Sequence, residues 1–284
     1  MKELLKKLFK LEIRLRKKVN SQMKGSFSSV FKGSGIEFAD IRSYQYGDDI
    51  RTINWTATAK GHDTYVNTYK EEHEQQVIVV LDVSGSQNIG RDIRKIDVSR
   101  EIAALMALVS ARENSQVGLL CFSDSKEKYV KPQKGMHAAY NIISSIYRLQ
   151  PKSYKTDLNE GLRELNNVLK KKSLVILISD FIDDNYEANL TTLAIKHDLI
   201  VIHVSERRES IIPRLGIIPI YDNELQKTIW VNSSSKKFRE SVTATFKNNN
   251  KNLMALCKKT NADYLNIFCH EDYILKLIEL FKNR

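Results

Sequence analysis

The stretch Val77–Ser86 constrains the fold of this chain most, because it reads V-I-V-V-L-D-V-S-G-S. Five apolar residues run without interruption into the carboxylate of Asp82 and the hydroxyls of Ser84 and Ser86. A short apolar run that ends in polar residues predicts a strand buried on both faces of a parallel sheet. Folds of this kind collect their functional groups at the carboxyl ends of the strands. We therefore expect a site where this strand ends.

The polar end of this stretch is suited to binding a cation. Alternate positions of an extended strand share a face, and Gly85 lets the chain turn so that Asp82, Ser84 and Ser86 face a common point. Oxygen ligands in such a group suit a hard cation such as Mg²⁺, which takes about six oxygens and retains some of its waters. A purely structural interpretation stays open at this point: a helix start capped by serine, with Asp82 as a helix cap.

Two later segments complete a resemblance. The pattern D-x-S-x-S resembles the first element of the metal-ion-dependent adhesion site of von Willebrand factor A-like domains. That resemblance implies a threonine on a second loop, which Thr156 supplies in S-Y-K-T-D-L, and an aspartate after a later strand, which Asp180 supplies after L-V-I-L-I-S. The implied metal ligands are Asp82, Ser84, Ser86, Thr156 and Asp180, with Mg²⁺, or another divalent cation such as Mn²⁺ or Ca²⁺, as the ion.

Strands and helices alternate along most of the chain. Apolar runs predict strands at 117–122, 174–178, 198–204 and 264–269, and helical periodicity predicts helices at 95–112, 137–149, 157–169, 186–196, 238–260 and 273–282. This alternation predicts a doubly wound, mostly parallel α/β sheet of von Willebrand factor A-like (Rossmann-like) type, with an irregular N-terminal extension. Pairs of short strands are expected around 129–132, beside the strand 117–122, and at 217–221 with 228–231.

Three segments are expected along the chain. Residues 1–24 form a basic amphipathic helix, residues 25–72 an extension that packs on the main domain, and residues 73–284 the main domain. Within the extension, residues 65–72 alternate as an edge strand would. The segment 33–60 is dense in charge and aromatic rings. A local salt-bridge network that folds this loop onto the domain is one interpretation. The other is a partner-binding surface made by Arg42, Asp48, Asp49, Arg51 and Trp55.

Basic charge is concentrated at the N-terminus. Residues 1–24 carry nine Lys or Arg and two Glu, which is +7 of the total formal charge of +11. The remaining chain is nearly balanced and contains no recognisable nucleic-acid-reading module. One face of this helix is apolar, and its residues are Leu4, Leu8, Leu11, Leu15 and Val19. Three interpretations stay open: the helix docks on the body, it binds an acidic partner, or it lies on an anionic membrane surface.

The chain also resembles one bacterial family over most of its length. Residues 37–55, E-F-A-D-I-R-S-Y-Q-Y-G-D-D-I-R-T-I-N-W, followed by D-V-S-G-S at 82–86, resemble the family called domain of unknown function 58. The similarity continues through 178–181, 197–204 and 211–216. Family members are similar to von Willebrand factor A domains and are typically encoded beside MoxR-type AAA ATPases. Many carry N-terminal transmembrane helices, which the short basic helix of this chain does not match.

The resemblance implies a non-enzymatic protein-binding module that works with a MoxR-type AAA ATPase on a client protein complex. A metal-dependent hydrolase of a phosphate ester is the alternative from another class, because a cation near carboxylates can activate water. A basic-tail adaptor at a membrane or nucleic acid is the third. Three cysteines without a C-x-x-C pair, and no apolar run of membrane-spanning length, favour the cytoplasm, with peripheral contact at the inner membrane face open.

Overall fold

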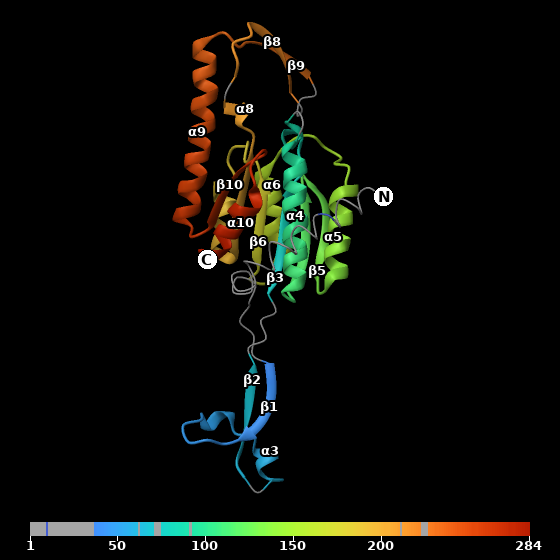
Figure 1. Cartoon of the computed structure of the whole chain (residues 1–284), viewed down its shortest axis with the longest axis vertical. Coiled ribbons are helices and arrows are strands. Elements are labelled where there is room, and N and C mark those ends of the chain that lie inside the picture. Colours follow the sequence, from blue (N-terminus) through green and yellow to red (C-terminus); the bar gives the residue numbers. More distant parts are fainter. Residues whose placement is uncertain are drawn as a thin grey trace.

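A six-stranded sheet forms the centre of the protein, in the spatial order β10-β7-β6-β3-β4-β5 (Figure 1). The computed structural model describes residues 37–61, 63–70, 75–90, 93–210, 212–222 and 227–284, together with Lys10. The strands are β3 (Gln76–Asp82), β4 (Gln116–Phe122), β5 (Lys126–Gln133), β6 (Leu174–Ser179), β7 (Asp198–Ser205) and β10 (Asp263–Phe268). All neighbours pair in parallel except β5, which pairs antiparallel with β4 at one edge.

β3 lies in the interior of this sheet. Val79 pairs with Leu119 of β4 on one side and with Ile176 of β6 on the other. Its side chains alternate between two apolar layers, since Val77, Val79 and Leu81 enter one cluster while Ile78 and Val80 enter the other. The strand is therefore buried on both faces, as the uninterrupted apolar run predicts, and its functional groups gather at its carboxyl end.

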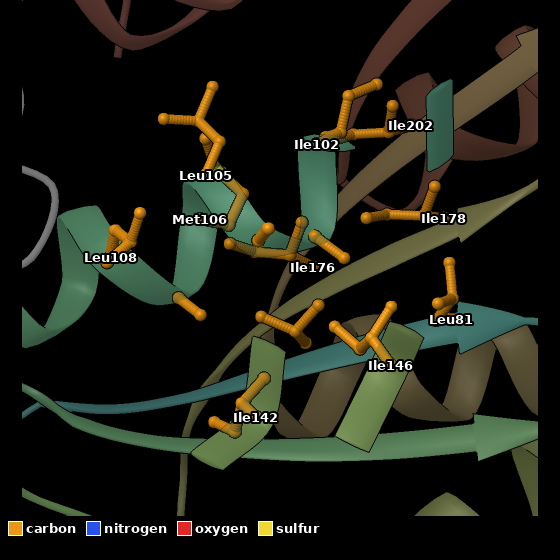
Figure 2. Packing of buried hydrophobic residues seen from close by; sticks show 14 of the residues in the cluster. Leu81, Ile102, Leu105, Met106, Leu108, Ile142, Ile146, Ile176, Ile178 and Ile202 are labelled. Carbon is orange, nitrogen blue, oxygen red and sulfur yellow. The ribbon is translucent and has the colours of Figure 1, made fainter. Parts of the chain in front are cut away.

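Helices cover both faces of the sheet. One face carries α4 (Lys95–Arg112), α5 (Met136–Arg148) and α10 (Tyr273–Lys282). The other carries α6 (Leu158–Val168), α7 (Glu187–Lys196) and α9 (Lys236–Lys259). Figure 2 shows Ile102 and Met106 of α4 and Ile142 of α5 among the strand residues Leu81 and Ile176. The predicted doubly wound α/β fold is confirmed.

Small side chains let α4 pack closely on the sheet. Ala103 and Ala107 are buried on this helix, and Ala139 is buried on the neighbouring α5. Burying each large aliphatic side chain of this layer contributes about 1.5–3 kcal/mol, so the helix is stabilised mainly by packing. Because α4 follows the loop after β3 directly, its first turn is fixed beside the end of that strand.

A second, smaller unit precedes β3. It consists of β1 (Glu37–Ser43), the 3₁₀ helix η1 (Ile50–Thr52), the short helix α3 (Trp55–Thr58) and β2 (Tyr65–Lys70). β1 and β2 pair antiparallel in a sheet of their own. In Figure 1 this unit lies apart from the six-stranded sheet. Its described hydrogen bonds include contacts among its own turns and strands. The expectation that residues 25–72 pack on the main domain stays a prediction.

Another hairpin lies between β7 and α9. It follows the short helix α8 (Arg207–Ser210) and consists of β8 (Ile217–Asp222) and β9 (Lys227–Asn232), which pair antiparallel as predicted. A final short element, the 3₁₀ helix η2 (Gly85–Asn88), follows β3. The predicted basic helix of residues 1–24 lies outside the described residues apart from Lys10.

Candidate functional site

The candidate site begins with Asp82, the last residue of β3, whose side chain is fully buried. One carboxylate oxygen, Oδ1, accepts the backbone N–H of Ser84 at 2.9 Å. The other, Oδ2, accepts the hydroxyl of Ser179, the last residue of β6, at 2.7 Å. The turn after β3 and the end of the neighbouring strand β6 therefore each fix one oxygen of this carboxylate. Ser179 was missed in the sequence, although it stands directly before Asp180.

The hydroxyls of Ser84 and Ser86 lie together next to Asp82. Gly85 starts η2, and the tight turn brings the two Oγ atoms to 3.1 Å from each other. Ser84 precedes this short helix but makes no side-chain capping hydrogen bond. The purely structural interpretation, in which a serine caps a helix start, therefore does not describe the hydroxyl of Ser84.

The loop that carries Thr156 is fastened to the loop after β3. The backbone N–H of Gly85 donates to the carbonyl of Tyr154 at 2.8 Å. On the other side of Thr156, Asp157 donates its backbone N–H to Ser123 and caps α6 by accepting the N–H of Glu160 at 2.7 Å. The structure thus places the half-buried Thr156 on a loop bonded to the D-x-S-x-S turn.

Asp180 follows β6 and is buried, but it is engaged by a cation of the protein itself. Its Oδ2 lies 2.5 Å from the Nζ of Lys95, the first residue of α4. The same ammonium lies 2.5 Å from Oε1 of Glu209 on α8. Lys95 is fully buried. Nothing in the sequence pattern indicates this, because a lysine in the first turn of a helix ordinarily extends into water.

Burial sets the charge states of this group. It raises the pKa of Asp82 to about 6, with a further contribution from the negative charge of Asp180, while hydrogen bonds from Ser84 and Ser179 act in the opposite direction. Burial alone would lower the pKa of Lys95, but the carboxylates of Asp180 and Glu209 outweigh it and the pKa is raised. The ammonium is therefore charged, and the carboxylates of Asp180 and Glu209 contact it directly.

A histidine also lies near Asp180. His203 on β7 is buried, and burial lowers its pKa to about 4. Its Nδ1 lies 2.9 Å from the hydroxyl of Tyr264, and its ring meets Phe181 edge-on. The imidazole is therefore neutral near pH 7 and already engaged in a hydrogen bond.

The structure does not bring the second set of candidate residues to this site. Arg42 and Asp48 form a two-point ion pair at 2.7 and 2.8 Å, and Asp49 accepts the N–H of Arg51 at the start of η1. These contacts shape the turn after β1. Trp55 begins α3 with 68% of its surface exposed. All of them belong to the small unit of residues 37–70.

Side-chain chemistry limits the kind of metal site that the end of β3 can form. Among the described residues, no group of three His, Cys, Asp or Glu side chains is placed to hold a metal ion. The three cysteines are buried and unpaired. The oxygen atoms that the structure brings together at the end of β3 are those of Asp82, Ser84 and Ser86.

A mostly parallel sheet with an antiparallel edge strand, helices on both faces and a D-x-S-x-S turn after β3 defines a von Willebrand factor A-like domain. Within this class, the chain belongs to the family described as "Protein of unknown function DUF58", which matches residues 40–252. The family-level resemblance seen in the sequence is thereby confirmed.

Relatives are known from sequence and from structure. An uncharacterized protein of Mycobacterium tuberculosis is 24% identical over 218 residues, which cover 75% of this chain and 69% of that protein. The conserved hypothetical protein BatB from Bacteroides thetaiotaomicron is 12% identical, with a TM-score of 0.46 over 74% of this chain and 98% of that chain. An aerotolerance-related membrane protein from Bacteroides fragilis is 14% identical, with a TM-score of 0.49 and the same coverage.

None of the helices in the described part of the chain is both long enough and apolar enough to cross a bilayer.

We expect Lys95 to be essential for the stability of the domain. Lys95→Met leaves Asp180 and Glu209 without their counter-charge, and removing one member of a buried ion pair costs about 3–5 kcal/mol. Chemical denaturation should show a loss of this size, whereas Lys251→Met, at an exposed position on α9, should change little. Adding Asp180→Asn to Lys95→Met should recover part of the loss. Equal stability of the two single variants would contradict the structural role of Lys95.

The raised pKa of Asp82 predicts a specific pH dependence. In chelator, the pKa of Asp82 is 3.8 in the unfolded chain and about 6 in the folded protein. Raising the pH between these two values therefore favours the unfolded state. The free energy of unfolding should fall by about 3 kcal/mol from this group, since one pH unit of separation corresponds to about 1.4 kcal/mol. Asp82→Asn should remove this component from denaturation curves measured between about pH 4 and 6.

A matched control is Asp97→Asn. Partial burial would raise the pKa of Asp97, but hydrogen bonds from Arg94 outweigh it and the pKa is lowered. Asp97 therefore contributes stability that is lost as the pH falls, which is the opposite of the dependence expected for Asp82. Asp97→Asn should remove this contribution and so change the pH dependence in the opposite direction to Asp82→Asn. An Asp82→Asn curve parallel to that of the wild type would show that Asp82 titrates normally.

Proposed function

We propose that this chain is a non-enzymatic protein-binding module whose contact with its partner depends on a divalent cation. Mg²⁺ is the first candidate, with Mn²⁺ and Ca²⁺ as alternatives. The ion would be held by Asp82, Ser84, Ser86 and Thr156, with Asp180 acting from a greater distance. By family resemblance, the module works with a MoxR-type AAA ATPase in the assembly or maturation of a client protein complex.

One observation carries this proposal: the turn after β3 presents two hydroxyls side by side next to a buried carboxylate. Ser84 Oγ and Ser86 Oγ lie 3.1 Å apart, and Asp82 is fixed by hydrogen bonds on both oxygens. The Thr156 loop is bonded to the same turn through Gly85. Hydroxyl and carboxylate oxygens are the ligands that Mg²⁺ takes in proteins.

The charges of the site fit a divalent cation. Asp180 and Glu209 contact the ammonium of Lys95, and the negative charge of Asp82 lies near that of Asp180. Three carboxylates and one ammonium in this part of the protein leave a net negative charge when all are ionised. A divalent ion would supply the missing charge. Since Lys95 already binds Asp180 directly, the ion would draw its closest ligands from Asp82 and the neutral hydroxyls.

A cation held mainly by neutral hydroxyls keeps most of its charge and attracts an external carboxylate. A partner's Asp or Glu would have to displace water from an ion that dehydrates reluctantly. The resulting contact would be moderate in strength and easily released. These are useful properties where an ATPase repeatedly reshapes a client.

The hydrolase alternative finds less support in the arrangement of side chains. Hydrolysis of a phosphate ester needs a group that moves a proton to or from the reacting oxygen. His203 is neutral and engaged with Tyr264, and Lys95 is enclosed by two carboxylates. The described residues therefore favour binding over turnover. Recruitment of the chain by its basic N-terminus stays a separate proposal, because residues 1–24 lie outside the described structure apart from Lys10.

Metal binding is tested by thermal unfolding. Mg²⁺ should raise the melting temperature of the full chain in proportion to its binding to the folded state. The double variant Ser84→Ala/Thr156→Ala should lose this rise while keeping its circular dichroism spectrum. Ser241→Ala/Thr192→Ala, which removes the same two hydroxyl types from helix surfaces, should respond like the wild type. An undiminished response in the first double variant would overturn the ligand assignment.

The partner contact is tested with the MoxR-type ATPase of the same organism. Binding to the purified ATPase should weaken on addition of chelator and should weaken by a similar factor in Asp82→Ala. Chelator and Asp82→Ala together should add little, because both remove the same bridge. Additive losses would mean that Asp82 and the metal act separately. Undiminished binding in chelator would move the contact elsewhere, with residues 33–60 as the next candidate.

A further inference from the structure

A cleft of about 350 Å³ opens beside the D-x-S-x-S turn. Val83, which lies between Asp82 and Ser84, forms part of its wall, and Asn88 of η2 forms another part. Tyr154, whose carbonyl accepts the N–H of Gly85, lines it from the loop that carries Thr156. The cleft is therefore built from the same two loops as the proposed metal site, but it does not include the metal-ligand side chains.

Two arginines of α4 and its cap line this cleft, Arg94 and Arg100. Nε of Arg100 is buried and has no hydrogen-bond partner. Asp97, the acidic group that acts on Arg100 electrostatically, is held by Arg94 through two hydrogen bonds of 3.0 Å. Buried donors in native proteins are almost always paired, and buried charges are paired or bind a ligand. Arg100 is half-buried and lines the cleft, and its unpaired Nε shows that the guanidinium has hydrogen-bonding capacity left for an anion that binds there.

The chemistry of the guanidinium indicates which anions fit. Its planar arrangement of N–H donors matches the two oxygens of a carboxylate or the oxygens of a phosphate. The position of the cleft favours a carboxylate on a protein partner. A chain that places one acidic side chain at the hydroxyls of Ser84 and Ser86 would carry its neighbouring residues past Val83 and Tyr154, into the cleft.

We propose that the Arg100 cleft binds a carboxylate of an acidic segment of the partner protein. Arg100 is a specificity-determining residue for that segment, and the segment needs at least two acidic side chains: one for the cleft and one for the cation. The second contact rests on the proposed metal-dependent function, whereas the contact with Arg100 does not require the metal.

A fluorescently labelled hexaglutamate peptide, measured by anisotropy against the full chain, tests this proposal. Arg100→Met should weaken binding about tenfold or more, the effect of losing a charge-assisted hydrogen bond. Arg112→Met is the matched control, since it removes the same charge from an exposed position on the same helix. The control should bind within about twofold of the wild type, because surface charges away from a contact contribute little. Equal losses in the two variants would reduce the effect to general charge attraction and overturn the proposal.

Chelator separates this inference from the proposed function. If both hold, chelator weakens peptide binding, and the binding that remains still depends on Arg100. If chelator weakens peptide binding but Arg100→Met does not, the proposal for the Arg100 cleft is overturned and the proposed metal contact is supported. An Arg100 effect without a chelator effect supports the cleft and counts against the metal contact. Inorganic phosphate is the competitor that distinguishes the source of the anion: if phosphate binds the cleft as tightly as the peptide, the ligand is a small anion and the acidic-segment proposal fails.

Thermal unfolding shows whether the variant is folded. Arg100 is half-buried, and removing an Nε that has no hydrogen-bond partner loses no hydrogen bond at that atom, so Arg100→Met without peptide should melt near the wild-type temperature. The peptide should raise the melting temperature of the wild type and leave that of Arg100→Met unchanged. If Arg100→Met does not fold, Arg100→Lys is the second variant, because lysine keeps the charge but lacks the planar pair of donors. The affinity of Arg100→Lys for the peptide should be lower than that of the wild type. Wild-type affinity in Arg100→Lys would contradict recognition by the guanidinium.

Discussion

Burial of the central sheet on both faces is the constraint on which the rest of this structure depends. Residues 77–81 of β3 and 174–178 of β6 are fully enclosed between two helical layers. Polar side chains cannot be placed along such strands without losing their hydration. They are therefore confined to the strand ends, and because parallel strands end at the same edge, Asp82, Ser179 and Asp180 come together. The site is a consequence of the sheet rather than an addition to it.

The buried ammonium of Lys95 connects this edge to the rest of the chain. It contacts Asp180 after β6 and Glu209 on α8, and it belongs to the first turn of α4. Three elements that are far apart in sequence thus share one charge. A buried ion pair of this kind contributes little net stability over an apolar replacement, but it strongly disfavours arrangements in which a partner is missing. In this protein it fixes the position of α8, which precedes the β8–β9 hairpin, relative to the candidate metal ligands.

The sequence predicts the central fold well because the relevant signals are local. An apolar run such as 174–178 can only be a buried strand in a chain that alternates strands and helices, and α4 begins and ends where its periodicity does. The spacing of Asp82, Ser84 and Ser86 predicts that they lie together at the end of β3, and the structure places them there. Lys95 and Arg100 do not, because their burial depends on Asp180, Glu209 and the 151–154 loop, all of which are distant in the chain. The independent sheet of β1 and β2 was likewise not foreseen: the partner of residues 65–70 is a strand of mixed charge whose apolar pattern is weak.

The placement of the tryptophans has a spectroscopic consequence. The chain has two, Trp55 on α3 and Trp230 on β9, and each exposes 68% of its surface. Both belong to peripheral two-stranded units rather than to the six-stranded sheet (Figure 1). Their indole rings already contact water in the native state, so loss of the core would change their emission little. Tyrosines of the main domain such as Tyr186 and Tyr264, which pack on the inner layer, carry the near-ultraviolet signature of the core instead.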